Sequence, residues 1–298
     1  MTLLDFAQSG DVEFLDRMGQ PTFHGFVHSV FNRTFNIRML DSDELYTIAS
    51  RELDNGPNTL IIDAEGFQDV GLLENDRVFV EDGLLHIGNK LVIFSKNCEK
   101  WCSVLPEYPE DLTVVTRNLL IMKRYVDVYG KGGGVKPDFT TDNLFSKEVS
   151  RVLNEQSRLL IEELSAGRID NALQHAKALI GLGPGLTPSG DDFLVGLFTI
   201  LNVQGIPFNG CLSFCEKVVE LSKTLTNEIS YMALKKASIG KVRESIIQLL
   251  SSVFYENEEK LLLSLNKVLS IGSSSGTDIA LGLISGLEAN IIKAGGKL

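Results

Sequence analysis

The sequence of 298 residues has no apolar run that approaches membrane-spanning length. Its first residues place Asp5, Asp11 and Glu13 where a signal peptide needs a basic flank and an apolar core. No cluster of Lys and Arg forms a basic stripe, and 28 basic against 39 acidic residues give a net charge of −11. We therefore expect a cytoplasmic protein that binds neither membranes nor nucleic acid.

Established motifs for catalysis and metal binding are also missing. The sequence contains no Gly-x-Ser-x-Gly elbow and no HExxH pattern. Its four cysteines form two Cys-x-x-x-Cys pairs, Cys98 with Cys102 and Cys211 with Cys215, which lie far apart in the chain and lack the turn glycines of a zinc knuckle. We predict reduced thiols that pack as small apolar side chains, and no metal held by cysteine.

The first part of the chain has the pattern of short β-strands. Between about residues 21 and 104, runs rich in Val, Ile, Phe and Thr alternate with turn sequences. Asp82-Gly83, between VFV and LLHI, predicts a hairpin turn. Closely spaced short strands are typical of a small antiparallel barrel or sandwich, so we assign residues 1–130 to a β-rich domain.

A glycine-rich segment follows, with the sequence KGGGVKP from Lys131 to Pro137. Two lysines among glycines can cover a phosphate, but the segment lacks the strand-to-helix context and the Ser or Thr after Lys that a Walker loop requires. We interpret residues 131–143 as a linker between two domains, with a phosphate-covering loop as the alternative.

From about Leu144, apolar residues recur at helical spacing, which predicts a helical domain over residues 144–298. The first helix is expected to end near Ala166-Gly167. The fold class is therefore α+β, with an N-terminal β-rich barrel or sandwich followed by a C-terminal multi-helix domain. Further helices are expected to begin near Ile169, Asp192, Cys211, Thr224, Val242, Glu256 and Gly276.

The helical domain contains a pseudo-repeated loop and helix motif. Residues 181–197 read GLGPGLTPSGDDFLVGL, and residues 272–283 read GSSSGTDIALGL. With Ser189 set on Ser275, an offset of 275 − 189 = 86, both fit the pattern [ST]-x-S-G-x-D-x-x-x-G-L. The match predicts a duplicated unit whose two loops face each other across a pseudo-twofold axis.

Each copy is suited to hold a small anion. Glycines permit positive φ and close approach of a ligand, and the first turn of a helix leaves unpaired N–H groups at the positive end of its dipole. We expect the amides of residues 189–192 and 275–278 to meet at one hollow that binds phosphate, carboxylate or both. The candidate substrate-binding residues of the two loops are Gly183, Gly185, Thr187, Ser189, Gly190, Ser273, Ser274, Ser275 and Gly276.

Three aspartates, Asp191, Asp192 and Asp278, lie in the same motifs and are the candidate catalytic residues. Carboxylates repel an anion unless a cation or a proton intervenes. Three roles stay open: capping of the helix N-termini, binding of Mg²⁺ that bridges to a phosphate, and action as a general base or as an acceptor for an amino group. The pairing of the motifs favours a site role for Asp192 and Asp278. The sequence fixes no cofactor, and Mg²⁺ stays an option.

Two further pairs complete the candidates. Thr226 and Ser230 lie four residues apart and share a face if they are helical, so they either line the same cleft or bond back to their own helix. Gly196 and Gly282 follow one turn into each motif helix, and we expect them to permit a close helix crossing and not to bind a ligand.

The string GLGPGLTPSGDDFLVG, followed by Thr226-x-x-Ile-Ser230 and GSSSGTD, resembles a bacterial domain-of-unknown-function family that includes the AllH-type subunits of oxamate carbamoyltransferase. The resemblance covers the chain from about residue 144, and the β-rich first half matches by length and order alone. It implies reversible carbamoyl transfer between carbamoyl phosphate and oxamate, which gives oxalurate and phosphate in the anaerobic use of allantoin-derived purine nitrogen. It also implies partner subunits, one of them similar to the alpha chain of succinyl-CoA ligase.

The residues alone leave two other functions open. The glycine-rich repeats can serve tight packing between subunits in a non-catalytic assembly protein, which would gain no stability from phosphate or oxamate. A nucleotide-dependent ligase or kinase-like enzyme that uses Mg²⁺ is the other, although the sequence shows no pocket for a base and ribose. The resemblance assigns no role to single residues, so the candidate site rests on the loop argument.

Overall fold

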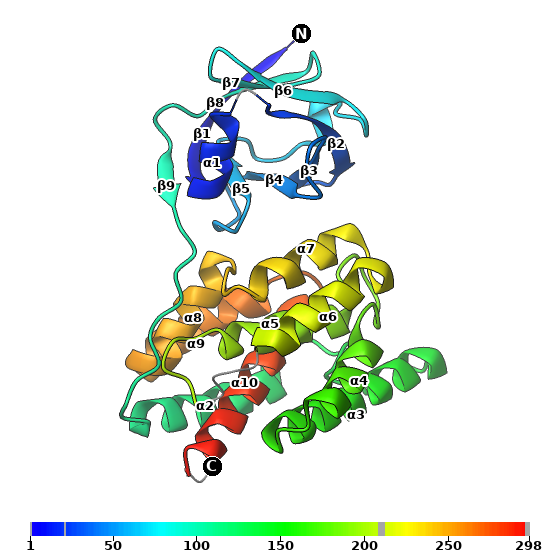
Figure 1. The fold of residues 1–298 in the computed structure, drawn as a ribbon, viewed down its shortest axis with the longest axis vertical. Coiled ribbons are helices and arrows are strands. Elements are labelled where there is room, and N and C mark those ends of the chain that lie inside the picture. Colours follow the sequence, from blue (N-terminus) through cyan, green and yellow to red (C-terminus); the bar gives the residue numbers. More distant parts are fainter. Residues whose placement is uncertain (1, 21, 208–211, 296–298) are drawn as a thin grey trace. The chain divides into compact units, whose positions relative to one another are not determined.

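The computed structural model describes residues 2–20, 22–207 and 212–295. Its internal contacts divide the chain into two compact units, residues 1–103 and residues 104–298 (Figure 1). Each unit has its own hydrophobic core.

The first unit is a closed β-barrel of eight strands with one extra strand, which confirms the predicted β-rich barrel. The strand order is β5-β4-β3-β2-β6-β7-β8-β1-β9, and an additional pairing between β5 and β1 closes the barrel. Most neighbouring strands are antiparallel, but β1 is parallel to β8 and β9, and β4 is parallel to β5. The strands are β1 (Leu3–Asp11), β2 (His24–Val30), β3 (Thr34–Met39), β4 (Leu45–Ser50), β5 (Thr59–Ile62), β6 (Arg77–Glu81), β7 (Leu84–Ile87), β8 (Leu91–Phe94) and β9 (Glu99–Trp101).

The hairpin between β6 and β7 confirms the turn predicted at Asp82-Gly83. Both residues have positive φ, 51° at Asp82 and 77° at Gly83, as the two central positions of a type I′ turn require. Strand β1 and the short helix α1 (Val12–Met18) precede the expected strand region and were not predicted. Phe14 of α1 is nevertheless fully buried in the barrel core, so this first segment belongs to the fold.

The second unit is helical, as predicted. Helices α5 and α10 form its central pair (Figure 1), and every residue of α5 is buried. The wide apolar faces read from the sequence therefore pack inside this unit. The helices are α2 (Thr113–Tyr129), α3 (Leu144–Ser165), α4 (Ile169–Leu179), α5 (Ser189–Leu201), α6 (Leu212–Leu225), α7 (Glu228–Ala237), α8 (Glu244–Tyr255), α9 (Glu258–Leu269) and α10 (Ser275–Lys293).

Helix α2 belongs to the helical unit, so the boundary between the two units lies earlier in the chain than predicted. The helix lies in residues that the sequence analysis gave to the β-rich domain, but it packs against α8, α9 and α10. Its buried face includes Val115, Leu119 and Met122, which belong to the core of the helical unit. The two units consequently divide between residues 103 and 104, earlier in the chain than the expected boundary at residue 130.

One helix boundary was predicted wrongly. Helix α6 continues to Leu225, so no helix begins near Thr224. The next helix begins at Glu228 because the side chain of Asn227 accepts hydrogen bonds from the first amides of α7 and caps it. The start of α6 was expected at Cys211, which lies outside the described residues.

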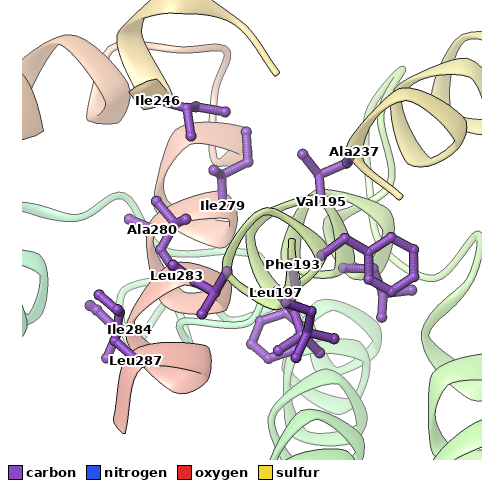
Figure 2. Packing of buried hydrophobic residues seen from close by; sticks show 14 of the residues in the cluster. Phe193, Val195, Leu197, Ala237, Ile246, Ile279, Ala280, Leu283, Ile284 and Leu287 are labelled. Carbon is purple, nitrogen blue, oxygen red and sulfur yellow. The ribbon is translucent and has the colours of Figure 1, made fainter. Parts of the chain in front are cut away.

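The crossing of α5 and α10 depends on two glycines. A Cβ atom at Gly196 would stand 2.2 Å from the carbonyl oxygen of Ile279, and one at Gly282 would stand 2.1 Å from the carbonyl oxygen of Phe193. Phe193 and Ile279 are themselves equivalent positions, since 279 − 193 = 86, so the contact is reciprocal. Figure 2 shows the apolar side chains that pack around the two helices. The packing role predicted for Gly196 and Gly282 is confirmed.

Candidate functional site

The two predicted loops meet where α5 and α10 begin. The hydroxyl oxygen of Thr187, in the first loop, lies 3.0 Å from that of Ser275, at the start of α10. The first turns of both helices are buried, so the contact lies at the inner ends of the loops. The expectation that the two motifs face each other is therefore confirmed.

Each aspartate lies against the serine of the other loop. Asp192 Oδ2 accepts a 3.0 Å hydrogen bond from Thr187, and the hydroxyl of Ser275 also acts on this carboxylate. The Asp278 carboxyl in turn lies beside the hydroxyl of Ser189, which acts to lower its pKa. Because Ser189 is equivalent to Ser275 and Asp192 to Asp278, the two halves exchange partners. A local twofold axis produces such reciprocal contacts.

Burial governs the ionisation of these two carboxyls, since the side chain of Asp278 is fully buried and that of Asp192 nearly so. Burial raises the pKa of Asp192 to about 7, helped by the charge of Asp278 and opposed by the hydroxyls of Ser275 and Thr187. Burial likewise raises the pKa of Asp278 to about 6, against the opposing hydrogen bond from the Val135 amide. Both carboxyls therefore gain and lose protons near neutral pH, the range in which a general acid or base is effective.

Asp191 has a different environment. Its carboxylate accepts a 2.9 Å hydrogen bond from the Gly181 amide and another from the Thr226 hydroxyl. Burial raises the pKa of Asp191, while the hydroxyls of Thr226 and Ser230 oppose that shift. Thr226 precedes α7 and so does not share a helical face with Ser230. Thr226 hydrogen-bonds to the Asp191 carboxylate, whereas the buried Ser230 hydroxyl lies near it without a hydrogen bond among the described residues. Asp191 thus ties the first loop to the start of α7.

The backbone amides of the first helical turns are already used. Those of residues 190–192 and 276–278 donate to carbonyls of their own loops. For these six amides the expectation that they are free for an anion is wrong, because the loops themselves supply the acceptors; the amides of Ser189 and Ser275 are not among the six. The aspartates do not cap the helices either, since the N-cap residues are Pro188 and Ser274. The remaining donors for a ligand are the hydroxyls and the loop amides before each helix.

The loops turn at two equivalent glycines. Gly183 and Gly272 have φ of 119° and 58°, and a Cβ atom on either would stand 3.0 Å from the hydroxyl of Ser189 or Ser275, respectively. The offset here is 272 − 183 = 89, three more than the 86 of the helices. The first loop is therefore three residues longer than the second, which the gapless alignment did not reveal.

Gly190 and Gly276 serve packing. A Cβ atom at Gly190 would stand 1.9 Å from the carbonyl oxygen of Leu179, and one at Gly276 would stand 1.9 Å from that of Val268. Each motif helix thus begins in direct contact with the backbone of the helix before it. A larger residue at either glycine would disturb the fold, so such a variant cannot report on ligand binding.

Two buried polar atoms between the loops lack a protein partner. Ser189 Oγ and Asp278 Oδ2 make no hydrogen bond within the described residues, and both side chains are fully buried. The Ser189 hydroxyl is close enough to Asp278 to lower the pKa of its carboxyl, but the geometry of the two groups is not that of a hydrogen bond. Buried polar atoms are nearly always paired. A proton on Asp278 that is donated to Ser189 Oγ, or a small polar ligand that reaches the two atoms, would complete their hydrogen bonding.

The glycine-rich segment belongs to the site, which the sequence analysis missed by favouring a linker. The Lys131 amide donates to Thr277 Oγ1 at 2.8 Å, and the Val135 amide donates to Asp278 Oδ1 at 2.8 Å. A Cβ atom at Gly134 would stand 2.3 Å from both oxygens of the Asp278 carboxylate, so only glycine fits there. The two lysines among glycines were the available signal, but nothing in the sequence linked them to the second loop.

The other candidates form the rim of the site. Gly185 and Ser273 are exposed, Thr187 and Ser275 are half-buried, and Ser274 is buried. The hydroxyl and amide donors therefore lie at the accessible edge of the site, and the carboxyls lie in its interior.

Among the described residues, no group of three or more His, Cys, Asp or Glu side chains is placed to hold a metal ion. Cys98 is half-buried, Cys102 is exposed and Cys215 is buried. No helix in the described part of the chain is long and apolar enough to cross a membrane.

A pocket of about 440 Å³ is lined by α3 and by residues 137–139. Its two arginines, Arg151 and Arg158, are paired with glutamates of the same helix. Pro137 ends the glycine-rich segment and lines this pocket, but the pocket's lining includes no residue of the two loops, so we do not assign the pocket to the site.

Two family models match the chain. The model described as oxamate carbamoyltransferase subunit AllH matches residues 179–287, which contain both loops, and the model described as AllH family N-terminal domain matches residues 6–100. The two matches together cover most of the chain and confirm the resemblance drawn from the loop motifs. The barrel, compared before by length and order alone, has a match of its own. No solved structure matches the chain.

Proposed function

The chain belongs to the AllH family of oxamate carbamoyltransferase subunits, and we propose that its paired loops bind carbamoyl phosphate and oxamate and transfer the carbamoyl group between them. The observation that carries this proposal is the meeting of the two loops at Thr187, whose hydroxyl donates to Asp192 and lies 3.0 Å from the hydroxyl of Ser275. It gathers hydroxyl donors and two titratable carboxyls in one place. The family description implies a subunit of a larger enzyme, so we also propose that partner chains complete the active complex.

The rim of the site is suited to anionic substrates. The hydroxyl of Ser273 is exposed, and the half-buried hydroxyls of Thr187 and Ser275 lie on Asp192 in the free chain, so they would turn from that carboxylate to a substrate oxygen. Hydrogen bonds from such donors to phosphate or carboxylate oxygens are strengthened by the charge of the acceptor. Two loops can hold one substrate each, which turns a reaction between two molecules into one between neighbours. A donor near the carbamoyl oxygen also stabilises the charge that develops there.

The raised pKa values of Asp192 and Asp278 explain how these carboxyls can lie beside a bound anion. Two ionised carboxylates beside a phosphate would repel it by several kcal/mol, at about 4 kcal/mol for a pair of charges 4 Å apart near a protein surface. With a pKa of about 7 for Asp192 and about 6 for Asp278, protons are available to reduce that repulsion. The same pKa leaves part of Asp192 ionised at neutral pH, as a general base requires.

The proposed reaction uses Asp192 as the base. The amide nitrogen of oxamate attacks the carbonyl carbon of carbamoyl phosphate, and a C–N bond forms. The bond from that carbon to the phosphate oxygen breaks, and phosphate leaves with the electron pair. The nitrogen loses one proton, which Asp192 accepts and later passes to solvent. The products are oxalurate and phosphate.

The packing alternative is weakened by the place of the glycines. Gly196 and Gly282 meet inside the chain, at the crossing of α5 and α10, and Gly190 contacts the carbonyl of Leu179 in the same chain. The close backbone contacts of the repeats are therefore satisfied without a second subunit.

The proposal is tested by an assay of the chain with its partner subunits, in which oxalurate and phosphate are measured from carbamoyl phosphate and oxamate. We expect Thr187→Val and Ser275→Ala to lower kcat/KM about tenfold each, because each loses one hydrogen bond to a charged group. Ser270→Ala is the matched control, since Ser270 ends α9 and its hydroxyl bonds to the Lys267 carbonyl. Wild-type turnover by both loop variants, or no oxalurate from the wild-type complex, would overturn the proposal.

A further inference from the structure

The glycine-rich segment forms a third wall beside the two loops. Its amides bond to Thr277 and to Asp278, both in the first turn of α10, and Gly134 lies directly against the Asp278 carboxylate. The segment is thus held against the second loop at two points. The first loop is held by a different element, the start of α7, where Asn227 Nδ2 donates to the carbonyl of Leu186 at 2.7 Å.

The two lysines of the segment do different things. Lys136 Nζ donates to the carbonyls of Val126, Asp127 and Gly130, at the end of α2, and so folds the segment back on itself. Lys131 Nζ donates to one carbonyl, that of Gly272 in the second loop, at 3.0 Å. An ammonium group has three N–H donors, so two donors of Lys131 remain for a ligand.

Lys131 also supplies a positive charge, which would offset the repulsion between the aspartates and an anionic substrate. Its charged group hydrogen-bonds to the second loop at the carbonyl of Gly272. Its side chain is exposed, and the exposed Ser273 follows the carbonyl that it contacts.

We propose that Lys131 binds the phosphoryl group of the substrate at the second loop, beside Ser273, and that the glycine-rich segment is a phosphate-binding element of the site. This inference rests on the proposed function and assigns the phosphate to the covered half. The carboxylate of the other substrate then falls to the first loop. A lysine ammonium is well suited to this task because it acts as a point charge with donors that rotate freely.

The test is calorimetric titration of the full chain with inorganic phosphate and, separately, with oxamate. We expect Lys131→Met to weaken phosphate binding about tenfold or more, as expected for the loss of a charged hydrogen bond, and to leave oxamate binding unchanged. Lys131→Arg keeps the charge and should retain most of the phosphate affinity. Lys217→Met, an exposed lysine of α6, is the matched control and should bind both ligands as the wild type does.

The outcomes separate this inference from the proposed function. If the wild type binds both ligands and Lys131→Met binds phosphate equally well, the role of Lys131 is wrong and the carbamoyl transfer proposal stands. If Lys131→Met loses phosphate binding but the wild type does not bind oxamate, the phosphate element is supported and the proposed substrate pair is contradicted. If the wild type does not bind phosphate, the inference fails.

Discussion

The first and second loops start from the same motif and end in different surroundings. In both motifs a serine is the first residue of the helix, and the aspartate three residues later contacts the other motif. The second loop is shorter and lies under the glycine-rich segment, whereas the first loop is three residues longer and is tied to α7 through Asp191. The shared part of the two halves is the packing and the exchanged pairing. The difference lies in what covers each aspartate, and a site for two unlike substrates needs that difference.

The exposed fractions support a division of roles. Asp192 is 7% exposed and contacts the half-buried Thr187, while Asp278 is fully enclosed and fixed by the Val135 amide. Proton exchange with solvent is easier for the carboxyl nearer the rim. We therefore propose that Asp192 transfers the proton and that Asp278 shapes the phosphate side.

The largest expected effect is on turnover. Asp192→Asn should lower kcat of the complex by about 10²- to 10⁴-fold, the usual contribution of a general base. Asp278→Asn should lower kcat by about tenfold, because it alters the neighbourhood of the base. Oxalurate formation measures both, and circular dichroism verifies that the variants are folded. An equal loss for the two variants would erase the proposed division of roles.

The dependence of stability on pH comes next in size. Because burial raises the pKa of Asp192 from 3.8 to about 7, the folded chain holds a proton that the unfolded chain has lost between those values. The free energy of unfolding should therefore fall as pH rises from 4 to 7, by at most about 4 kcal/mol from this residue. Asp192→Asn should lose part of that slope and exceed the wild type in stability at pH 8.

Urea unfolding at pH 4, 6 and 8 measures this slope. Asp170→Asn, at the exposed start of α4, is the control and should keep the wild-type slope. A slope that is the same in Asp192→Asn and in the wild type would mean that Asp192 is not held protonated in the folded chain.

The crossing of α5 and α10 tests the equivalence of the two halves. Gly196→Ala and Gly282→Ala should each destabilise the fold by about 3 kcal/mol, because the new Cβ atom meets backbone that cannot move aside. Gly286→Ala is the control, since its Cβ atom would meet the side chain of Ile200 at 2.9 Å, and about 1 kcal/mol is expected. Thermal unfolding measures all three, and a large difference between the two crossing glycines would break the symmetry argument.

The smallest expected effect concerns the cover of the second loop. Gly134→Ala should destabilise the chain by about 1 to 3 kcal/mol, because its Cβ atom would collide with the Asp278 carboxylate. In Asp278→Ala the collision is relieved, so the two changes should couple by about 1 kcal/mol in a double-mutant cycle. Strictly additive effects would show that Gly134 and Asp278 do not meet in solution.

Several features could be read from the sequence because they are local or repeated. The turn at Asp82-Gly83 follows from residue type, and the pairing of the two motifs follows from their equal spacing. Gly196 and Gly282 were predictable as packing positions since each recurs one turn into a motif helix.

The remaining features depend on contacts between distant segments. Gly134 contacts Asp278 only after α2 has packed against α10, and no residue near position 134 predicts that contact. The raised pKa of Asp192 depends on how deeply α5 is buried, which hydrophobic spacing alone does not give. The use of the first-turn amides by loop carbonyls likewise depends on the loop path.

The most direct measurement is a crystal structure of the chain grown with phosphate and oxamate. The account predicts phosphate density within hydrogen-bond distance of Lys131 Nζ and of Ser273 or Ser275, with oxamate beside Thr187 in the first loop. Density for both ligands elsewhere on the chain, with the paired loops unchanged, would contradict it.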